Sequence, residues 1–372
     1  MKKSLLALAA LGAFAGAAQA QSSVTLYGVA DMNLEYVSHI GTQAPSAANG
    51  FSAGQGNNLY RMSSGGLSGS RWGLRGVEDL GGGMKALFVL ENGFALDTGS
   101  LQQGGRLFGR QAYVGLESSQ FGRITFGRQY TTLFDLLANF SPSGYATQYE
   151  PVVAQLGLNF RSDNTAKYTG VFGPVTAIAH WSFGNGALGA GEVPGQFRRD
   201  TGYGAGVGYA AGPFGATVAY DQYNPTLSAT GDTGTFKKAA VAGSYAFGPA
   251  KIMGGYRWGQ SKGPGGAPVL RDDYYWIGAN YQVTAPLGLT LQYNYDNVKN
   301  LGGNTHLANP WQISFIADYN LSKRTDLYLT TAFSKNAGLN FDTSAISFAN
   351  GYFLGNGKNT MLGAAVGIRH KF

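Results

Sequence analysis

The sequence contains no cysteine, and after the N-terminus no run approaches the roughly 18 consecutive apolar residues that a membrane-spanning helix needs. The first absence excludes a disulfide framework and a thiol nucleophile. The second, with a mean hydropathy of −0.11, gives no sign of a helical membrane protein. A chain of 372 residues without disulfides must be held together by a large fold and by backbone pairing.

The N-terminus carries a targeting pattern. Lys2 and Lys3 precede an apolar stretch over 5–18, and an A-x-A cleavage site follows at 18–20. This pattern predicts a secretory signal peptide over residues 1–20. The mature chain, 21–372, is then expected to form one domain.

Charged residues make up only 13% of the chain, and no basic run occurs. The net charge of +7 falls to +5 without the two N-terminal lysines, which is too mild to indicate nucleic-acid binding. The four histidines have no companion at catalytic or metal-binding spacing, and neither G-x-S-x-G nor H-E-x-x-H is present. We therefore expect no enzymatic activity, no bound metal and no cofactor.

Glycine (58), tyrosine (22) and phenylalanine (22) are abundant, which suits closely packed strands more than helices. Short turn signals built on Gly, Pro and polar residues recur at 78–83, 119–122, 172–174, 212–213, 248–249, 285–288 and 320–324. Eight longer polar segments alternate with these seven turns, near 38–59, 95–105, 131–158, 185–200, 224–234, 260–271, 297–308 and 335–358. Fifteen connections predict sixteen strands, with all short turns at one end of an antiparallel meander, as in outer-membrane barrels.

The predicted strands alternate between an apolar and a polar face. In 311–319, for example, Trp311, Ile313 and Phe315 share one face, while Gln312 and Ser314 share the other. Aromatic residues gather at strand ends, where membrane interfaces would lie, and the strands run about ten residues, enough to cross a bilayer at a tilt. Hydrocarbon cannot hydrogen-bond an open sheet edge, so the first strand must pair with the last.

Several stretches together resemble the general (trimeric) porins of Gram-negative bacteria, particularly the β-proteobacterial branch. They lie at 23–28, 70–81, 109–116, 121–130 and 361–372. The resemblance implies an all-β, 16-stranded antiparallel transmembrane barrel in the outer membrane, whose third long loop folds inward. It also implies a homotrimer in contact with outer-membrane lipid and lipopolysaccharide. The terminal Phe372 resembles the signal that the outer-membrane assembly machinery reads. The expected function is passive, water-filled diffusion of small hydrophilic solutes and inorganic ions.

The predicted pore chemistry is basic. Arg71 and Arg110 match positions that the family uses for its basic constriction cluster, and Arg75 and Arg128 are the next candidates. The facing loop, 131–158, holds only two acids, Asp135 and Glu150. A charged constriction selects ions by long-range attraction and repulsion, so this balance predicts a weak to moderate preference for anions.

Three points stay open at this stage. Arg110 shares its alternation face with Val114 and Leu116, so the sequence does not resolve which way this strand faces. A substrate-specific channel would need lumen-facing aromatic residues, whereas the predicted lumen faces are mostly Gly, Ser, Thr, Asn and Gln. An adhesion barrel would place function in the loops, but the longest loops, 38–59 and 335–358, have the composition of solvated surface.

Overall fold

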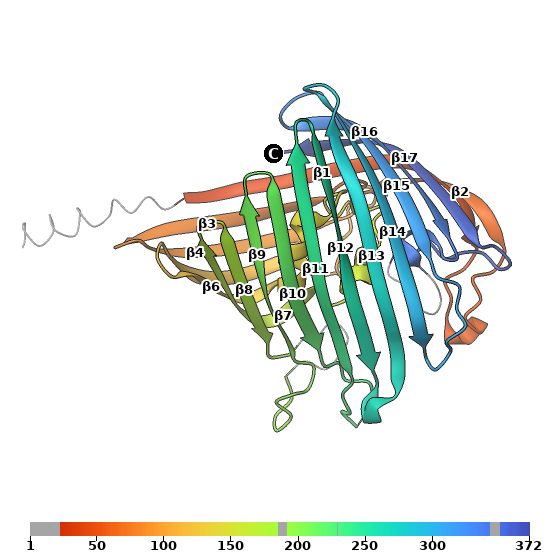
Figure 1. The fold of residues 1–372 in the computed structure, drawn as a ribbon, viewed down its shortest axis with the longest axis horizontal. Coiled ribbons are helices and arrows are strands. Elements are labelled where there is room, and N and C mark those ends of the chain that lie inside the picture. Colours follow the sequence, from red (N-terminus) through yellow and green to blue (C-terminus); the bar gives the residue numbers. More distant parts are fainter. Residues whose placement is uncertain (1–22, 185–191, 229, 343–349) are drawn as a thin grey trace, which may run out of the picture.

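The structure, a computed structural model, describes residues 23–184, 192–228, 230–342 and 350–372. Within these ranges, seventeen strands form one antiparallel sheet that closes on itself, because β1 pairs with β17 (Figure 1). The strands are β1 (Ser23–Gly41), β2 (Gly56–Ser64), β3 (Arg71–Gly81), β4 (Met84–Gly93), β5 (Gln111–Ser118), β6 (Gly122–Tyr130), β7 (Arg161–Phe172), β8 (Val175–Ser182), β9 (Gly202–Ala211), β10 (Phe214–Tyr223), β11 (Thr235–Phe247), β12 (Ala250–Lys262), β13 (Pro268–Gln282), β14 (Leu287–Leu301), β15 (Trp311–Asn320), β16 (Thr325–Lys335) and β17 (Thr360–Lys371).

The barrel nevertheless has sixteen positions around its wall. β2 pairs with the second half of β1 and β3 pairs with its first half, so β2 and β3 are two pieces of one barrel strand. The predicted 16-stranded antiparallel barrel is confirmed. The sequence pattern did not predict the interruption at 65–70, where the chain leaves the sheet. The predicted signal peptide, 1–20, lies outside the described residues.

Every predicted tight turn joins two neighbouring strands, and these turns gather at one end of the barrel (Figure 1). Three of them share a Gly-Pro pair. Gly173, Gly212 and Gly248 have φ values of 59°, 55° and 53°, which a residue with a side chain rarely adopts. A glycine with positive φ at the first central position suits a two-residue hairpin.

The alternation along the strands places apolar side chains outside and polar ones inside. In β15, Ile313 points outward and is 40% exposed, whereas its neighbours Gln312 and Ser314 are buried in the interior. Val114, Ile277 and other large apolar side chains are likewise exposed on the outer surface. An apolar exterior around a polar interior is the reverse of a soluble fold and suits a lipid environment.

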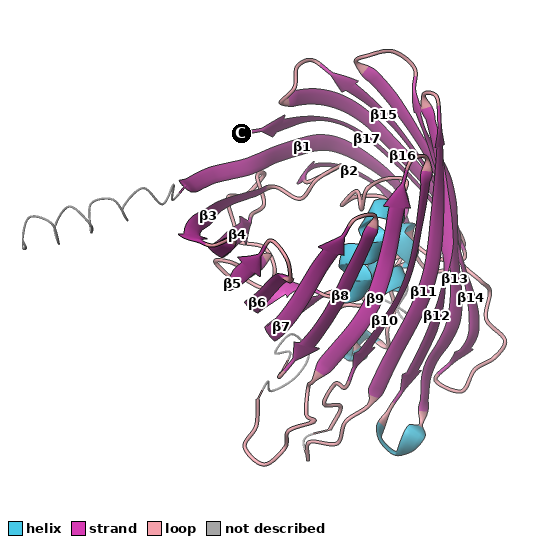
Figure 2. Ribbon diagram, turned by 60° about the vertical axis from the view of Figure 1, so that its left-hand side comes forward, coloured by secondary structure: helices cyan, strands magenta, loops and turns pink. Residues whose placement is uncertain are grey.

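Two long loops enter the barrel. The third loop (131–160, between β6 and β7) carries α2 (Thr132–Leu137), η2 (Ala138–Phe140) and α3 (Val152–Leu156), and Figure 2 shows these helices inside the sheet. The eighth loop (336–359, between β16 and β17) carries η4 (Leu339–Phe341), which packs against α3. Two short helices, η1 (Ala47–Asn49) and η3 (Pro264–Gly266), lie in other long loops. In the described part of the chain, no helix is long and apolar enough to cross a membrane.

The eighth loop corrects the expectation that 335–358 is solvated surface. Leu339, Asn340, Phe341 and Asp342 are fully buried. Composition misled here because a loop rich in small polar residues can still be buried where the surrounding wall offers hydrogen-bond partners.

The interruption at 65–70 is held by one carboxylate. Asp31, fully buried on β1, accepts hydrogen bonds from the backbone N–H groups of Gly66, Leu67 and Ser68 at 2.9, 3.0 and 2.7 Å. It also accepts one from Tyr328 Oη at 2.5 Å. The segment thereby replaces the strand hydrogen bonds that it gives up.

Asp31→Asn should lower the free energy of unfolding by about 2–4 kcal/mol, because the buried N–H groups lose a charged acceptor. Urea unfolding of the barrel in lipid or detergent measures the change. Asp97→Asn, on an exposed loop, is the control and should have almost no effect. Equal stability of the two variants would contradict the role given to Asp31.

Candidate functional site

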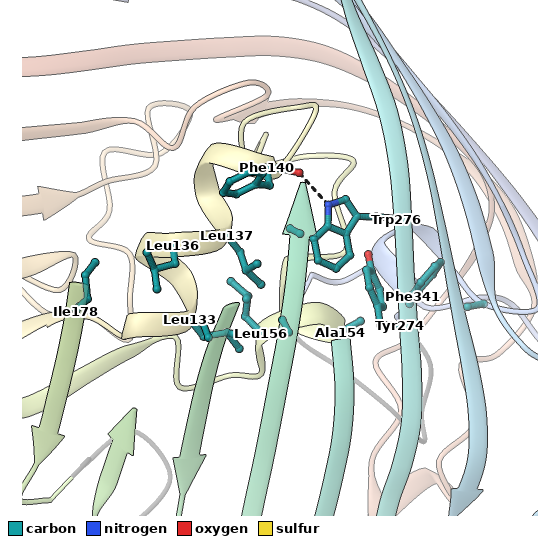
Figure 3. Packing of buried hydrophobic residues seen from close by; sticks show 14 residues of the cluster. Leu133, Leu136, Leu137, Phe140, Ala154, Leu156, Ile178, Tyr274, Trp276 and Phe341 are labelled. Carbon is teal, nitrogen blue, oxygen red and sulfur yellow. Dashed lines mark hydrogen bonds between the residues drawn. The ribbon is translucent and has the colours of Figure 1, made fainter. Parts of the chain in front are cut away.

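The third loop is fixed against the inner wall by an apolar cluster. Leu133, Leu136 and Leu137 recur at a spacing that places them on one face of α2. This face packs with Phe140 against Ile178 and the small side chains of β10 and β11 (Figure 3). Helix α2 begins after Thr131, whose side chain accepts a hydrogen bond from Phe134 N.

Polar side chains of the far wall bind the loop backbone. Trp276 Nε1 donates to Phe140 O at 2.8 Å (Figure 3), and Gln312 Nε2 donates to Tyr149 O at 2.9 Å. Arg257, fully buried, donates to Ala154 O at 2.6 Å and to Gln155 O at 3.0 Å, and it pairs with Asp272 at 2.6 Å. These bonds satisfy carbonyl groups of a buried loop that has few regular hydrogen bonds of its own.

The eighth loop is joined to the third. Phe341 belongs to the same apolar cluster as Ala154, and Asn340 N donates to Gln312 Oε1 at 2.7 Å. Tyr149 of the third loop and Tyr352 of the eighth donate to the same oxygen, Glu35 Oε1, at 2.8 and 2.7 Å. The two loops therefore form one structure inside the barrel.

Between the third loop and the wall of β3–β7 lies a cavity of about 460 Å³. Its wall side includes Arg71, Arg110 and Arg161, called the basic wall below. Two carboxylates also line the cavity, Glu91 and Glu150. The rest of the lining is a mixture of small, amide and aromatic residues, among them Ser68, Gln103, Thr147, Phe134, Tyr145 and Val152.

The basic wall is held in place by neighbouring side chains. Arg110 Nε donates to Glu91 Oε1 at 2.7 Å, and Arg71 Nε lies 3.8 Å from Glu91 Oε2. Arg110 Nη2 and Arg161 Nη2 both donate to Tyr130 Oη at 3.1 Å. Three guanidinium groups thus share one carboxylate and one phenol, so positive charge remains in excess on this wall.

Arg71 and Arg110 lie together, but Arg75 and Arg128 do not line this cavity. Arg128 Nη1 pairs with Asp163 Oδ1 at 2.5 Å, and Arg106 binds the same carboxylate at 2.9 Å. Arg75 is exposed on β3 and lies over the ring of Tyr27, 5.5 Å from its centroid.

The direction of the strand near Arg110 is now resolved. Arg110 precedes β5, so the alternation of that strand does not extend to it. Val114 and Leu116 point outward and are 58% and 47% exposed, whereas the Arg110 side chain faces the interior.

Both acids of the third loop have partners. Asp135 Oδ2 accepts from Lys167 Nζ at 2.7 Å. Glu150 lines the cavity but is only 3% exposed, and it accepts hydrogen bonds from Ser141 Oγ at 2.6 Å and from Ser143 Oγ. Burial raises the pKa of Glu150 above the usual value for glutamate.

The sequence analysis missed the aromatic part of the cavity. Tyr130, Phe134, Tyr145 and Phe160 belong to the third loop or its edges, where no alternation indicates a direction. The sequence signal that could have indicated them is that all four aromatic residues lie within the third loop or directly beside it. Arg161, which ranks below the other arginines as a candidate on sequence because it lies near the loop's return, also lines the cavity.

A model of the family described as Gram-negative porin matches residues 7–339. The chain belongs to the Gram-negative porin family. An outer membrane porin of Bordetella pertussis is 32% identical over the full length of both chains, and outer membrane porin protein 32 of Delftia acidovorans is 34% identical, also over the full length of both. This porin is therefore an outer-membrane protein that forms a passive diffusion channel for small hydrophilic solutes.

Solved structures agree with the fold. The anion-selective porin of Comamonas acidovorans superposes with a TM-score of 0.76 at 28% identity, covering 95% of this chain and 100% of that one. OmpT, an outer membrane protein of Vibrio cholerae solved in a trimer form, superposes at 0.66 with 15% identity, covering 94% and 99% of the two chains. At 15% identity, the similarity to OmpT supports the fold and nothing further.

Arg257→Met should loosen the third loop, because Ala154 O and Gln155 O lose their donor and Asp272 loses its partner. Breaking such a buried pair costs about 3–5 kcal/mol. We expect larger open-channel current noise in planar bilayers. Arg271→Met is the matched control, because the hydrogen bonds of Arg271 within the described residues all go to groups of β12 and β13. A folded Arg257→Met channel with the noise of the parent would refute this anchoring role.

Proposed function

We propose that the cavity beside the basic wall is the constriction of this porin, and that it gives the channel a weak to moderate preference for anions. The observation that carries the proposal is the charge of the lining. Arg71, Arg110 and Arg161 present three guanidinium groups, whereas the carboxylates of Glu91 and Glu150 are occupied by hydrogen bonds within the protein. A fixed positive lining attracts anions and repels cations over several ångströms.

The other charged residues have secondary roles in this proposal. Arg128, paired with Asp163, and Arg75, exposed on β3, extend the positive field beyond the narrowest part. Asp135 and Glu150 form the acidic side, and each is weakened as a cation site by its partners. The anion-selective porin of Comamonas acidovorans supports the direction of the preference.

The proposal extends to the assembly. The outer face of β1, β2, β16 and β17 carries shallow apolar hollows lined by Leu34, Leu329 and Val366, which supports packing into a homotrimer within outer-membrane lipid and lipopolysaccharide. Phe372 exchanges backbone hydrogen bonds with Gly28 and is 47% exposed, which supports recognition of this residue by the assembly machinery.

We assign no catalytic activity to the chain. Family and fold point to a channel.

Reversal potentials across a KCl gradient test the preference. The parent channel should favour chloride, and Arg71→Gln with Arg110→Gln should lower the chloride-to-potassium permeability ratio by about fivefold or more. A unit charge about 4 Å from an ion contributes about 1 kcal/mol even in water. Arg324→Gln, in an exposed turn, is the control. A cation-selective parent channel would overturn the proposal.

The preference should also depend on pH. Because its pKa is raised, Glu150 takes up a proton at a higher pH than an ordinary glutamate as the solution is acidified, and the constriction then loses a negative charge. The anion preference should therefore increase as pH falls. Glu150→Gln should lack this component, whereas Glu78→Gln, at an exposed position near the end of β3, should keep it. Identical pH profiles for the parent and Glu150→Gln would show that Glu150 is not responsible.

A further inference from the structure

The constriction carries an aromatic layer directly beside its guanidinium groups. The rings of Tyr130 and Phe134 stack with centroids 3.9 Å apart and planes at 5°. Phe134 also stacks on Phe160 at 5.5 Å and contacts Tyr145 at 5.0 Å. All four rings line the same cavity as the basic wall, and they are called the aromatic layer below.

Arg161 joins the two features. Its guanidinium carbon lies 4.8 Å from the centroid of Tyr130 and 4.6 Å from that of Phe160. Among the described residues, Arg161 donates one side-chain hydrogen bond, from Nη2 to Tyr130 Oη, and the ion pair of Arg71 with Glu91 is long, at 3.8 Å. These two arginines therefore keep donor capacity for a further acceptor.

We propose that the constriction binds and favours the passage of small aromatic carboxylates, with benzoate as the simplest example. The inference rests on the proposed anion preference and names the class of anion that the site recognises best. A carboxylate matches the planar donors of a guanidinium group, and an aromatic ring gains stacking energy against other rings at centroid distances of about 4.5–7 Å. An inorganic ion would use only the first of these contacts.

The dimensions fit this class of ligand. A cavity of about 150 Å³ is enough to hold benzene. The constriction cavity measures about 460 Å³, so an aromatic acid fits beside the aromatic layer with room for water. Such a ligand slows the ion current while it occupies the site and then leaves, as transport requires.

Other solutes fit less well. A sugar gains from a succession of aromatic residues along the path, whereas these four rings are gathered at one place beside positive charge. An aromatic cation would stack equally well but would meet the excess of guanidinium groups, which repel it.

Single-channel recording in KCl tests the inference with four probes: benzoate, acetate, benzyl alcohol and benzyltrimethylammonium. Benzoate should reduce the current at a concentration about tenfold lower than acetate, because only benzoate makes the ring contact. Benzyl alcohol and benzyltrimethylammonium should be weaker than benzoate, because the first lacks the charge and the second reverses it.

Phe134→Leu should raise the half-blocking concentration of benzoate by about three- to tenfold, because stacking is lost while an apolar side chain of similar size remains. The half-blocking concentration of acetate should change much less than that of benzoate, because acetate makes no ring contact. Phe121→Leu, an exposed turn residue, is the matched control and should behave like the parent. If Phe134→Leu does not assemble, Phe160→Leu removes the other stacked partner and should give the same result.

The outcomes separate the two proposals. An anion-selective channel that benzoate and acetate block equally would overturn this inference and leave the proposed function standing. A cation-selective channel would overturn both. Benzoate block that Phe134→Leu and Phe160→Leu do not weaken would also overturn the inference, because the ligand would then bind away from the aromatic layer.

Discussion

The pairing of β1 with β17 is the interaction on which the rest of this structure depends. Nine residue pairs, from Val29 with Lys371 to Val37 with Gly363, join the two ends of the sheet and leave it without a free edge. Within hydrocarbon an unpaired backbone N–H or C=O group is costly, so a sheet that crosses a membrane must close. Once it is closed, each strand has one face toward lipid and one toward water, and the alternation of apolar and polar residues follows.

Closure also creates a wide polar interior, and the two inward loops determine its form. The third loop gives up most regular hydrogen bonds and recovers them from the wall, through Trp276, Arg257 and Gln312. The eighth loop packs against the third and meets it at Glu35. The two loops are therefore held by side chains of β1, β12, β13 and β15 that do not line the cavity beside the basic wall.

The cavity proposed as the constriction combines charge with aromatic surface by using the same side chains for both. Tyr130 holds Arg110 and Arg161 through its hydroxyl group, while its ring stacks on Phe134. Glu91 orients Arg110 but is largely hidden by doing so. Glu91 is the one carboxylate that pairs with these guanidinium groups, so the lining of the cavity keeps an excess of positive charge.

The sequence by itself determined the sixteen strand positions of the wall, the seven tight turns and, apart from the strand next to Arg110, which side chains face outward. These features are local, because alternation has a period of two residues and turns such as Gly173-Pro174 depend on their own backbone angles. It also indicated Arg71 and Arg110 as basic lumen residues. Only the tertiary structure decided the break at 65–70, the burial of Phe341, the place of Arg161 and the gathering of four aromatic rings. Those outcomes depend on contacts such as Phe140 with Trp276, which join residues more than a hundred positions apart in segments without a regular period.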